Sequence, residues 1–360
     1  MTQNQPSTAS PVEDSTNIRP RVSTTNPMEV QPTGFAPDWG PTIDPQMLAV
    51  VEHLLAYEAP PYPQLTADQA REAPTATDAV RGILSKTGTP PTAPAVDIAH
   101  ELIPGPADQD VLVRTYTPLT GNGPFPVIVY YHGGGWVIAN LDTYEPSAKV
   151  LAARTGAIVV SVAYRQAPEH KFPAAHEDSF AAYQWAVENA ADINGDPDRI
   201  ALAGESAGGN LAVAVALMAK ERGVRLPDHI LSVYPIADGD TNSSSYDQYA
   251  NAFPLNRPFM EWFFAQYLSS PEERENPLIS LTSADLSGLP PTTIINAEID
   301  PLRSEGEDLA AQMKAAGVDV VQMTYPGVTH EFFGMADILE QAVAAQELAA
   351  DRIMSAFNRE

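Results

Sequence analysis

The sequence of 360 residues contains no cysteine. Disulfide bridges and thiolate metal sites are therefore excluded, and composition gives no indication of the redox compartment. Long hydrophobic runs are also missing, since the longest apolar stretch, residues 211–219, is too short to cross a bilayer. The first 30 residues are polar and rich in proline, serine and threonine, without the apolar core of a secretory signal. We therefore expect a soluble, cytoplasmic protein.

Positive charge is scarce: 20 Lys and Arg residues stand against 46 Asp and Glu residues, which gives a net charge of -26. Such a surface repels phosphate backbones, so nucleic acid is not expected as a partner. It also argues against docking on anionic membranes. The sequence shows neither a ligand-spaced cluster of His, Asp and Glu nor a phosphate-binding loop. We therefore expect no metal ion and no organic cofactor.

The first quarter of the chain divides into two segments. Residues 1–40 are predicted to form a disordered or loosely docked arm, because prolines interrupt any periodicity and large aliphatic residues are few. Residues 41–90 carry apolar residues at helical spacing up to Pro60, and Thr66 with Gln69 forms a capping-box pattern for a second helix. Because these helices precede all predicted strands, they are candidates for a cap over the main domain.

Strand and helix patterns alternate over residues 91–360, which are predicted to form the main domain. Alternating residues near Val96 and Val111 predict two antiparallel strands at its start. Continuous apolar runs, typical of strands buried on both faces, follow at residues 127–131, 157–162, 200–203, 230–234, 292–295 and 318–323. Helical patterns occupy residues 144–154, 174–190, 207–222, 304–316 and 335–356. This alternation predicts an α/β fold with a mostly parallel central sheet flanked by helices. Residues 238–286 interrupt it and are predicted to be a helical insertion that contributes to the cap.

Gly204-Glu205-Ser206-Ala207-Gly208 is a G-x-S-x-G sequence at a predicted strand-to-helix turn. A sharp turn can hold the serine in a strained backbone conformation, and the two glycines leave room for it. The hydroxyl then stands at the N-terminal end of the following helix, where negative charge is stabilised. The five residues alone fit a glycine-rich packing turn equally well, so the rest of the chain has to decide.

A serine nucleophile needs a base, and the base needs an orienting acid. Of the seven histidines, only His229 and His330 follow Ser206. His229 opens a predicted strand, at the end opposite to the catalytic loops, which leaves His330 after the last strand as the expected base. Asp300 and Glu298 both follow the preceding strand, and Asp300 is preferred because it lies further past the strand, just before a helix. A competing structural interpretation makes Asp300 the N-cap of that helix.

His132-Gly-Gly-Gly-Trp136 directly follows the predicted strand at residues 127–131. Three successive glycines let the backbone approach a ligand without Cβ clashes. The carboxyl end of a buried strand is also where ligands bind in open α/β sheets. Backbone N–H groups of this loop, together with that of Ala207, are the expected donors to the negative charge that develops on a substrate oxygen.

These motifs together resemble those of the bacterial hormone-sensitive-lipase family (family IV) of carboxylesterases, which have the α/β-hydrolase fold. The resemblance extends from about residue 40 to the C-terminus. It rests on His132-Gly-Gly-Gly-Trp136, Tyr164-Arg-x-Ala-Pro-Glu-His170, Gly204-Glu-Ser-Ala-Gly-Gly209, Leu289-Pro-Pro291, Asp300-Pro-Leu-Arg303 and His330. The resemblance implies the following site residues: Ser206 as nucleophile, Asp300 as acid, His330 as base, and Gly134, Gly135 and Ala207 as oxyanion-hole donors. It also implies that His132 is structural and that the N-terminal helices cap an acyl pocket, and a homodimer is compatible with it.

The expected activity is that of a serine carboxylesterase, which hydrolyses short- to medium-chain acyl esters through an acyl-enzyme intermediate. An amidase, a peptidase or a polysaccharide or xenobiotic deacetylase with the same triad is the first alternative. A non-catalytic small-molecule receptor on this fold is the second, and the presence of His330 argues against it. A dehalogenase or epoxide hydrolase would require an aspartate in place of Ser206.

Three positions depart from the usual pattern of the family. Glu205 stands where aspartate usually precedes the serine, Ile299 where an aromatic residue is common, and Glu331 where glycine usually follows the histidine. None of these departures removes a catalytic group. Glu331 places a carboxylate beside His330, and our hypothesis is that it raises the pKa of that histidine.

Overall fold

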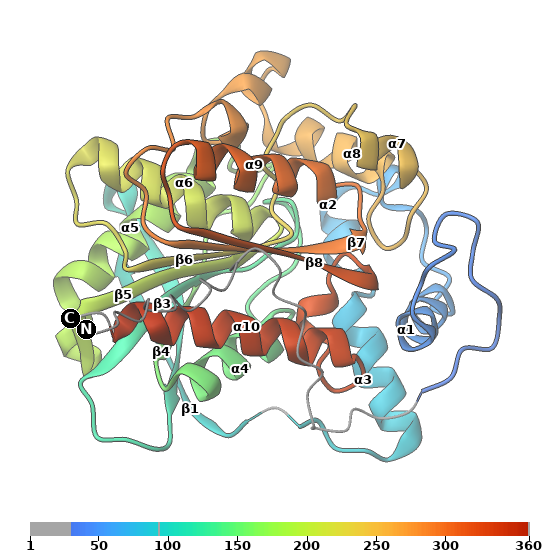
Figure 1. The fold of residues 1–360 in the computed structure, drawn as a ribbon, viewed down its shortest axis with the longest axis horizontal. Coiled ribbons are helices and arrows are strands. Elements are labelled where there is room, and N and C mark those ends of the chain that lie inside the picture. The colour runs from blue at the N-terminus through green and yellow to red at the C-terminus, as the bar shows by residue number, and fades with distance from the viewer. Residues whose placement is uncertain (1–29, 93, 359–360) are drawn as a thin grey trace, which may run out of the picture.

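The computed structural model describes residues 30–92 and 94–358, and it contains an eight-stranded sheet (Figure 1). The strands are β1 (Val96–Pro104), β2 (Asp110–Pro118), β3 (Phe125–Tyr131), β4 (Ile158–Ala163), β5 (Gly195–Glu205), β6 (His229–Val233), β7 (Thr292–Ile299) and β8 (Val320–Thr329). Their order across the sheet is β1-β2-β4-β3-β5-β6-β7-β8. β2 runs antiparallel to β1 and β4, whereas the other neighbours are parallel. The predicted antiparallel start of a mostly parallel sheet is therefore confirmed.

Helices cover both faces of this sheet. The α-helices in the described residues are α1 (Pro45–Leu55), α2 (Ala67–Arg71), α3 (Ala76–Thr87), α4 (Glu145–Thr155), α5 (Ala174–Asn189), α6 (Ala207–Arg222), α7 (Ser244–Gln248), α8 (Arg257–Tyr267), α9 (Arg303–Ala315) and α10 (Glu340–Phe357). Helices α4 and α10 lie on one face, and α5, α6 and α9 lie on the other (Figure 1). None of the helices in the described ranges is long and apolar enough to cross a membrane.

The continuous apolar runs of the central strands follow from this two-sided cover. In β3, Val127 and Val129 belong to the buried cluster under α5 and α6, whereas Ile128 and Tyr130 belong to the cluster under α4 and α10. Successive side chains of a strand point to opposite faces, so a sheet covered on both sides requires apolar residues at every position. The same arrangement leaves the strand ends as the places where polar groups can gather.

The N-terminal helices α1 to α3 and the insertion that carries α7 and α8 lie at the end of the sheet where β7 and β8 finish (Figure 1). The predicted capping box of Thr66 with Gln69 is present at the start of α2. The two regions contact each other, because the indole Nε1 of Trp262 donates a hydrogen bond to the carbonyl of Leu65 at 3.3 Å. Helices from both regions therefore meet over the carboxyl ends of the parallel strands.

The predicted arm at residues 1–40 lies partly outside the described residues. Its described part contacts α1: the carboxylate of Glu52 accepts hydrogen bonds from the backbone N–H groups of Thr33, at 2.7 Å, and Gly34, at 2.6 Å. Hydrogen bonds to a charged acceptor are stronger than those between neutral groups. Thr33 and Gly34 are thus held against the first helix.

Three sequence-based boundaries near the site are wrong. Strands β7 and β8 extend beyond their predicted ends, because they continue to pair as far as Ile299 opposite Thr329. Pro326 is tolerated in β8 because this strand is at the edge of the sheet, where no further strand needs its N–H. The last helix begins at Glu340 rather than at Met335, since residues 332–334 form a separate 3₁₀ turn.

Candidate active site

Ser206 occupies the turn between β5 and α6, with a backbone conformation of φ 58° and ψ -119°. A non-glycine residue rarely adopts a positive φ, and such strain persists only where the surroundings enforce it. A Cβ atom on Gly208 would lie 1.9 Å from the carbonyl oxygen of Tyr131, and one on Gly204 would lie 2.1 Å from the carbonyl oxygen of Gly208. The N–H of Ser206 donates a hydrogen bond to the carbonyl of Val233 at 2.9 Å. The turn is therefore locked between β3 and β6.

The three side chains predicted to form the triad lie within hydrogen-bonding distance of one another. Oγ of Ser206 is 2.9 Å from Nε2 of His330, and Nδ1 of His330 is 2.7 Å from Oδ2 of Asp300. These residues follow the carboxyl ends of β5, β8 and β7 directly. All three are buried, with 5%, 3% and 0% of their surface exposed in the order Ser206, His330, Asp300. The arrangement can pass a proton from the serine to an imidazole that the carboxylate orients.

Asp300 divides its two oxygens between two partners. Oδ2 faces the imidazole, whereas Oδ1 accepts a hydrogen bond from the N–H of Leu302 at 2.9 Å. The N-cap of α9 is Leu302 and no side chain caps this helix, so the interpretation of Asp300 as its N-cap is wrong. The alternative acid, Glu298, bonds instead to the hydroxyl of Thr42 and the N–H of Gly327, each at 2.7 Å.

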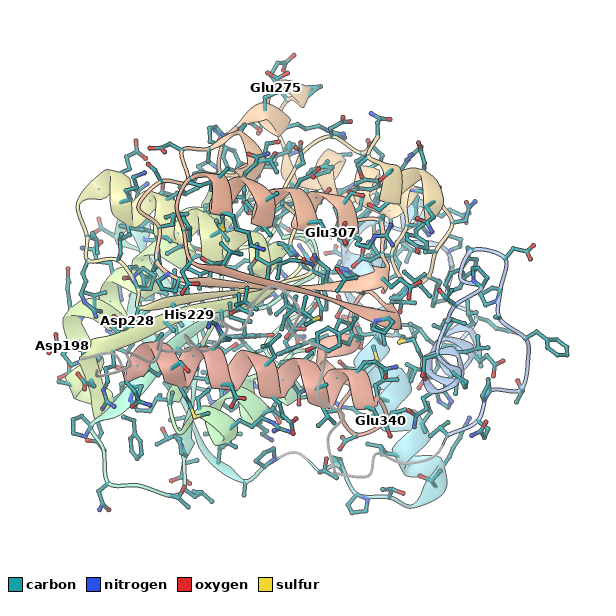
Figure 2. The ribbon with its side chains drawn as sticks, in the orientation of Figure 1. Asp198, Asp228, His229, Glu275, Glu307 and Glu340 are labelled. Carbon is teal, nitrogen blue, oxygen red and sulfur yellow. The ribbon has the colours of Figure 1, made fainter. Side chains whose placement is uncertain are left out.

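His229, the other histidine that follows Ser206, lies at the amino end of β6 beside Asp228. Figure 2 shows both residues at the end of the molecule away from α1 and α3. Its Nε2 is 3.0 Å from the hydroxyl of Thr293. The structure thus places His229 where the sequence predicted, at the end of the sheet opposite to Ser206.

Burial and charge act in opposite directions on His330. Burial alone would lower its pKa, but the charge and hydrogen bond of Asp300, together with the carboxylates of Glu331 and Glu205, outweigh this effect. The pKa of His330 is therefore raised above its ordinary value. Oε1 of Glu331 lies 3.9 Å from Nε2, so the carboxylate acts in the direction that the sequence-based hypothesis gives. A base with a raised pKa accepts a proton more readily but remains protonated to a higher pH.

The loop after β3 requires its glycines. Gly134 has φ 99° and Gly135 has φ 59°, a region of backbone conformation that favours glycine. A Cβ atom would lie 2.2 Å from the carbonyl oxygen of Ile138 in the first case and 2.1 Å from the ring of Phe263 in the second. Neither N–H group donates to another group in the described residues. The N–H of Ala207 belongs to the first turn of α6, where amides have no intrahelical acceptor.

His132, at the start of this loop, is held by contacts with Tyr164. The ring of Tyr164 stacks on it, with 4.3 Å between the ring centroids, and its hydroxyl donates a hydrogen bond to the carbonyl of His132 at 2.8 Å. Burial lowers the pKa of His132 to about 4, so its imidazole is neutral at physiological pH. These contacts fit the structural role that the resemblance implies for His132.

A cavity of about 360 Å³ opens over Ser206 and His330. Its walls combine residues of the N-terminal helices, the glycine loop and the insertion. Most of the side chains that line it are apolar, among them Leu54, Tyr62, Ile138, Leu255, Phe259 and Phe263. Glu331 is the one carboxylate among the described lining residues. Within the described ranges, this cavity included, no group of three or more His, Asp or Glu side chains is arranged to hold a metal ion.

Glu205 does not line the cavity, although it precedes Ser206 in the sequence. It is 1% exposed and accepts hydrogen bonds from the hydroxyl of Tyr130, at 2.5 Å, and from that of Tyr234. Burial raises the pKa of Glu205 to about 7. The ring of Tyr234 in turn packs against His330, with 4.5 Å between the centroids. Sequence reasoning missed both tyrosines, although a buried tyrosine hydroxyl usually has a hydrogen-bond partner.

Comparisons with known proteins show which family the chain resembles. A family model described as "alpha/beta hydrolase fold" matches residues 128–334. The carboxylesterase NlhH of Mycobacterium tuberculosis is 40% identical over 279 residues, which cover 75% of this chain and 88% of that protein. The ethyl acetate hydrolase of Pseudomonas putida is 35% identical over 234 residues, which cover 64% of this chain and 74% of that protein. The structure of a hyperthermophilic esterase from the archaeon Pyrobaculum calidifontis has a TM-score of 0.80 at 37% identity, and the match covers 87% of this chain and 98% of that one.

Proposed function

The chain belongs to the hormone-sensitive-lipase family of α/β-hydrolase carboxylesterases, and we propose that it hydrolyses short- to medium-chain acyl esters through Ser206, His330 and Asp300. Its relatives and structural neighbours support the wider class, a carboxylic ester hydrolase. The continuous path of hydrogen bonds from the serine hydroxyl to the buried aspartate is the observation that carries the assignment of the three residues.

The first half of the reaction acylates the serine. Nε2 of His330 accepts the proton of the Ser206 hydroxyl while Oγ attacks the ester carbonyl carbon. The carboxylate of Asp300 holds Nδ1–H and stabilises the imidazolium that forms. The negative charge moves to the former carbonyl oxygen, which gives a tetrahedral intermediate.

The oxyanion of this intermediate is bound by the backbone N–H groups of Gly134, Gly135 and Ala207. Two features support this role for the glycines: they line the cavity beside Ser206, and their amides donate to no other group in the described residues. Loss of one such donor typically lowers kcat by about 10²–10³. When the intermediate collapses, the imidazolium gives its proton to the leaving alkoxide, and the alcohol departs from an acyl-serine.

Water completes the cycle by the same route. His330 takes a proton from a water molecule while the oxygen of this water attacks the acyl carbon. The second tetrahedral intermediate then collapses, and the bond between the acyl carbon and Oγ of Ser206 breaks. The imidazolium returns its proton to this oxygen, the carboxylic acid leaves, and the enzyme is regenerated. One ester and one water molecule thus give one alcohol and one acid.

The cavity supports the proposed preference for short to medium chains. Its apolar walls gain about 0.8 kcal/mol for each methylene group that they bury, and its volume of about 360 Å³ limits how many they can accept. We propose that α1 to α3 and the insertion at residues 238–286 form the cap that closes this cavity. The P. putida relative bears the name of an enzyme for a small ester, which agrees with a short-chain substrate.

The proposal is tested by initial rates on p-nitrophenyl esters from acetate to palmitate. The wild type is expected to be fastest on short chains, and Ser206→Ala is expected to fall to the background rate. Ser287→Ala, which removes an exposed serine hydroxyl, is the matched control and keeps the wild-type rate. Activity that survives in Ser206→Ala, or a wild type that is inactive on every chain length, would contradict the proposal.

A further inference from the structure

Glu331 occupies a backbone position that favours glycine. It directly follows His330 and has φ 75° and ψ 1°, in the left-handed region. A non-glycine residue in this region costs on the order of 1–3 kcal/mol, and such residues cluster at sites where the side chain has a role. Because this strained residue lies next to the reacting imidazole, the carboxylate of Glu331 is a candidate for such a role.

The carboxylate of Glu331 is held in place but is not neutralised by a basic residue. The hydroxyl of Tyr144 donates a hydrogen bond to Oε1 at 2.7 Å, whereas Oε2 has no hydrogen-bond partner in the described residues. Neither Lys nor Arg forms an ion pair with Glu331 within those ranges, and its one charged contact is His330. The side chain is 24% exposed and lines the cavity. One oxygen is therefore available to a molecule bound there.

Aromatic side chains also line the cavity. Tyr62 stacks on Phe259 with 4.0 Å between centroids, and both line the cavity. The faces of aromatic rings attract cations, and ammonium groups are bound in this way in many proteins. A single carboxylate together with an aromatic wall is thus the chemistry that recognises an ammonium group. The net charge of -26 would also draw cationic substrates toward the protein.

The position of Glu331 indicates which part of the substrate it borders. Its Oε1 lies 3.9 Å from Nε2 of His330, the atom that returns a proton to the leaving oxygen. A group beside this nitrogen lies next to the alcohol part of the ester rather than the acyl part. We propose that Glu331 determines specificity for esters whose alcohol part carries an ammonium group, which is an inference that rests on the ester hydrolysis proposed above.

The test compares two esters of the same shape that differ in one charge. Butyrylcholine carries a quaternary ammonium group, and in 3,3-dimethylbutyl butyrate a carbon atom replaces that nitrogen. The wild type is expected to show a kcat/KM at least about tenfold higher for the cationic ester, as for a charge-assisted contact. In Glu331→Gln, which keeps the shape and an acceptor for Tyr144, this ratio is expected to fall toward one. Glu331→Gly, which relieves the left-handed backbone, is the second variant and is expected to lose the ratio while it folds.

Glu72→Gln is the matched control, because it removes one negative charge from an exposed residue that does not line the cavity. It is expected to keep the wild-type ratio. In about 0.5 M NaCl the ratio of the wild type is expected to persist, because salt screens a partly buried contact less than long-range attraction.

Equal kcat/KM values of the wild type for the two esters would overturn the inference. So would a kcat/KM ratio in Glu331→Gln that is as high as in the wild type. If the kcat/KM ratio of the wild type disappears in high salt, the preference for the cationic ester comes from the net charge of the protein rather than from Glu331, and the inference is overturned as well. p-Nitrophenyl butyrate separates this failure from that of the proposed function. If the wild type hydrolyses it without preferring the cationic ester, the specificity alone is wrong; if it hydrolyses none of the three esters, the ester hydrolysis is wrong.

Discussion

Ser206 and Glu331, two residues whose side chains approach Nε2 of the reacting imidazole, have positive φ angles of 58° and 75°. The first could be predicted from the sequence, because the glycines that permit the turn lie within two residues of the serine. The contact that holds the second could not, because its partner Tyr144 is 187 residues away and only the fold brings them together. A short motif is sufficient to predict the backbone geometry of its own residues, whereas a contact between distant side chains depends on how the whole chain packs.

The pH dependence of activity is a prediction at this scale. His330 accepts a proton only when it is neutral, so kcat/KM on p-nitrophenyl butyrate rises with pH through the pKa of this residue. Because that pKa is raised, the midpoint of the rise is expected above the ordinary histidine value of about 6.5. Glu331→Gln removes a carboxylate that favours the imidazolium, so the midpoint is expected to move to lower pH.

The control for this measurement is again Glu72→Gln, which leaves the imidazole untouched and should reproduce the wild-type profile between about pH 5 and 9. A midpoint in Glu331→Gln that stays in place or moves to higher pH would show that this carboxylate does not act on His330.

At the scale of elements, the site depends on the carboxyl ends of β5, β7 and β8. Strand and helix alternation predicted that these ends face the same edge of the sheet, and this is why Asp300 and His330 could be matched although 30 residues separate them. The lengths of β7 and β8 could not be predicted, because Pro326 and Gly327 are typical of a loop. They remain in a strand here because β8 has a neighbour on one side only.

The two carboxylates that follow the predicted core of β7 are expected to respond differently to removal. Asp300→Ala deprives the imidazole of its orienting acid, and kcat is expected to fall by about 10⁴ without a comparable rise in KM. Glu298→Ala removes hydrogen bonds to Thr42 and Gly327, each of which contributes about 1 kcal/mol to stability, and kcat is expected to stay within a few-fold of the wild type. Steady-state kinetics and urea unfolding of both variants measure the difference. A loss of kcat in Glu298→Ala as large as that in Asp300→Ala would make Glu298 the acid.

At the scale of the whole molecule, the cavity belongs to no single element. Residues 54–77 and 253–263 both contribute to its wall, and they meet over the end of the sheet (Figure 1). The helical character of the insertion was predictable from its pattern. The sequence could not predict which aromatic residues of the insertion face the cavity. Phe263 and Phe264 are both almost fully buried, and they differ only in the neighbours that the fold supplies.

Enlarging this cavity is expected to change the preferred chain length. Phe263→Ala removes a large side chain from the wall, so longer acyl chains can bury further methylene groups, at about 0.8 kcal/mol each, and the maximum of kcat/KM should move to longer esters. Phe180→Ala is the matched control: the side chain is equally buried, at 5% against 4% exposed, but it contacts Arg222 rather than the cavity. Both variants are expected to lose about 3–5 kcal/mol of stability, as measured by urea unfolding. Only Phe263→Ala should shift the chain-length profile. An unchanged maximum in that variant, or the same shift in both, would show that the chain-length limit is set elsewhere in the molecule.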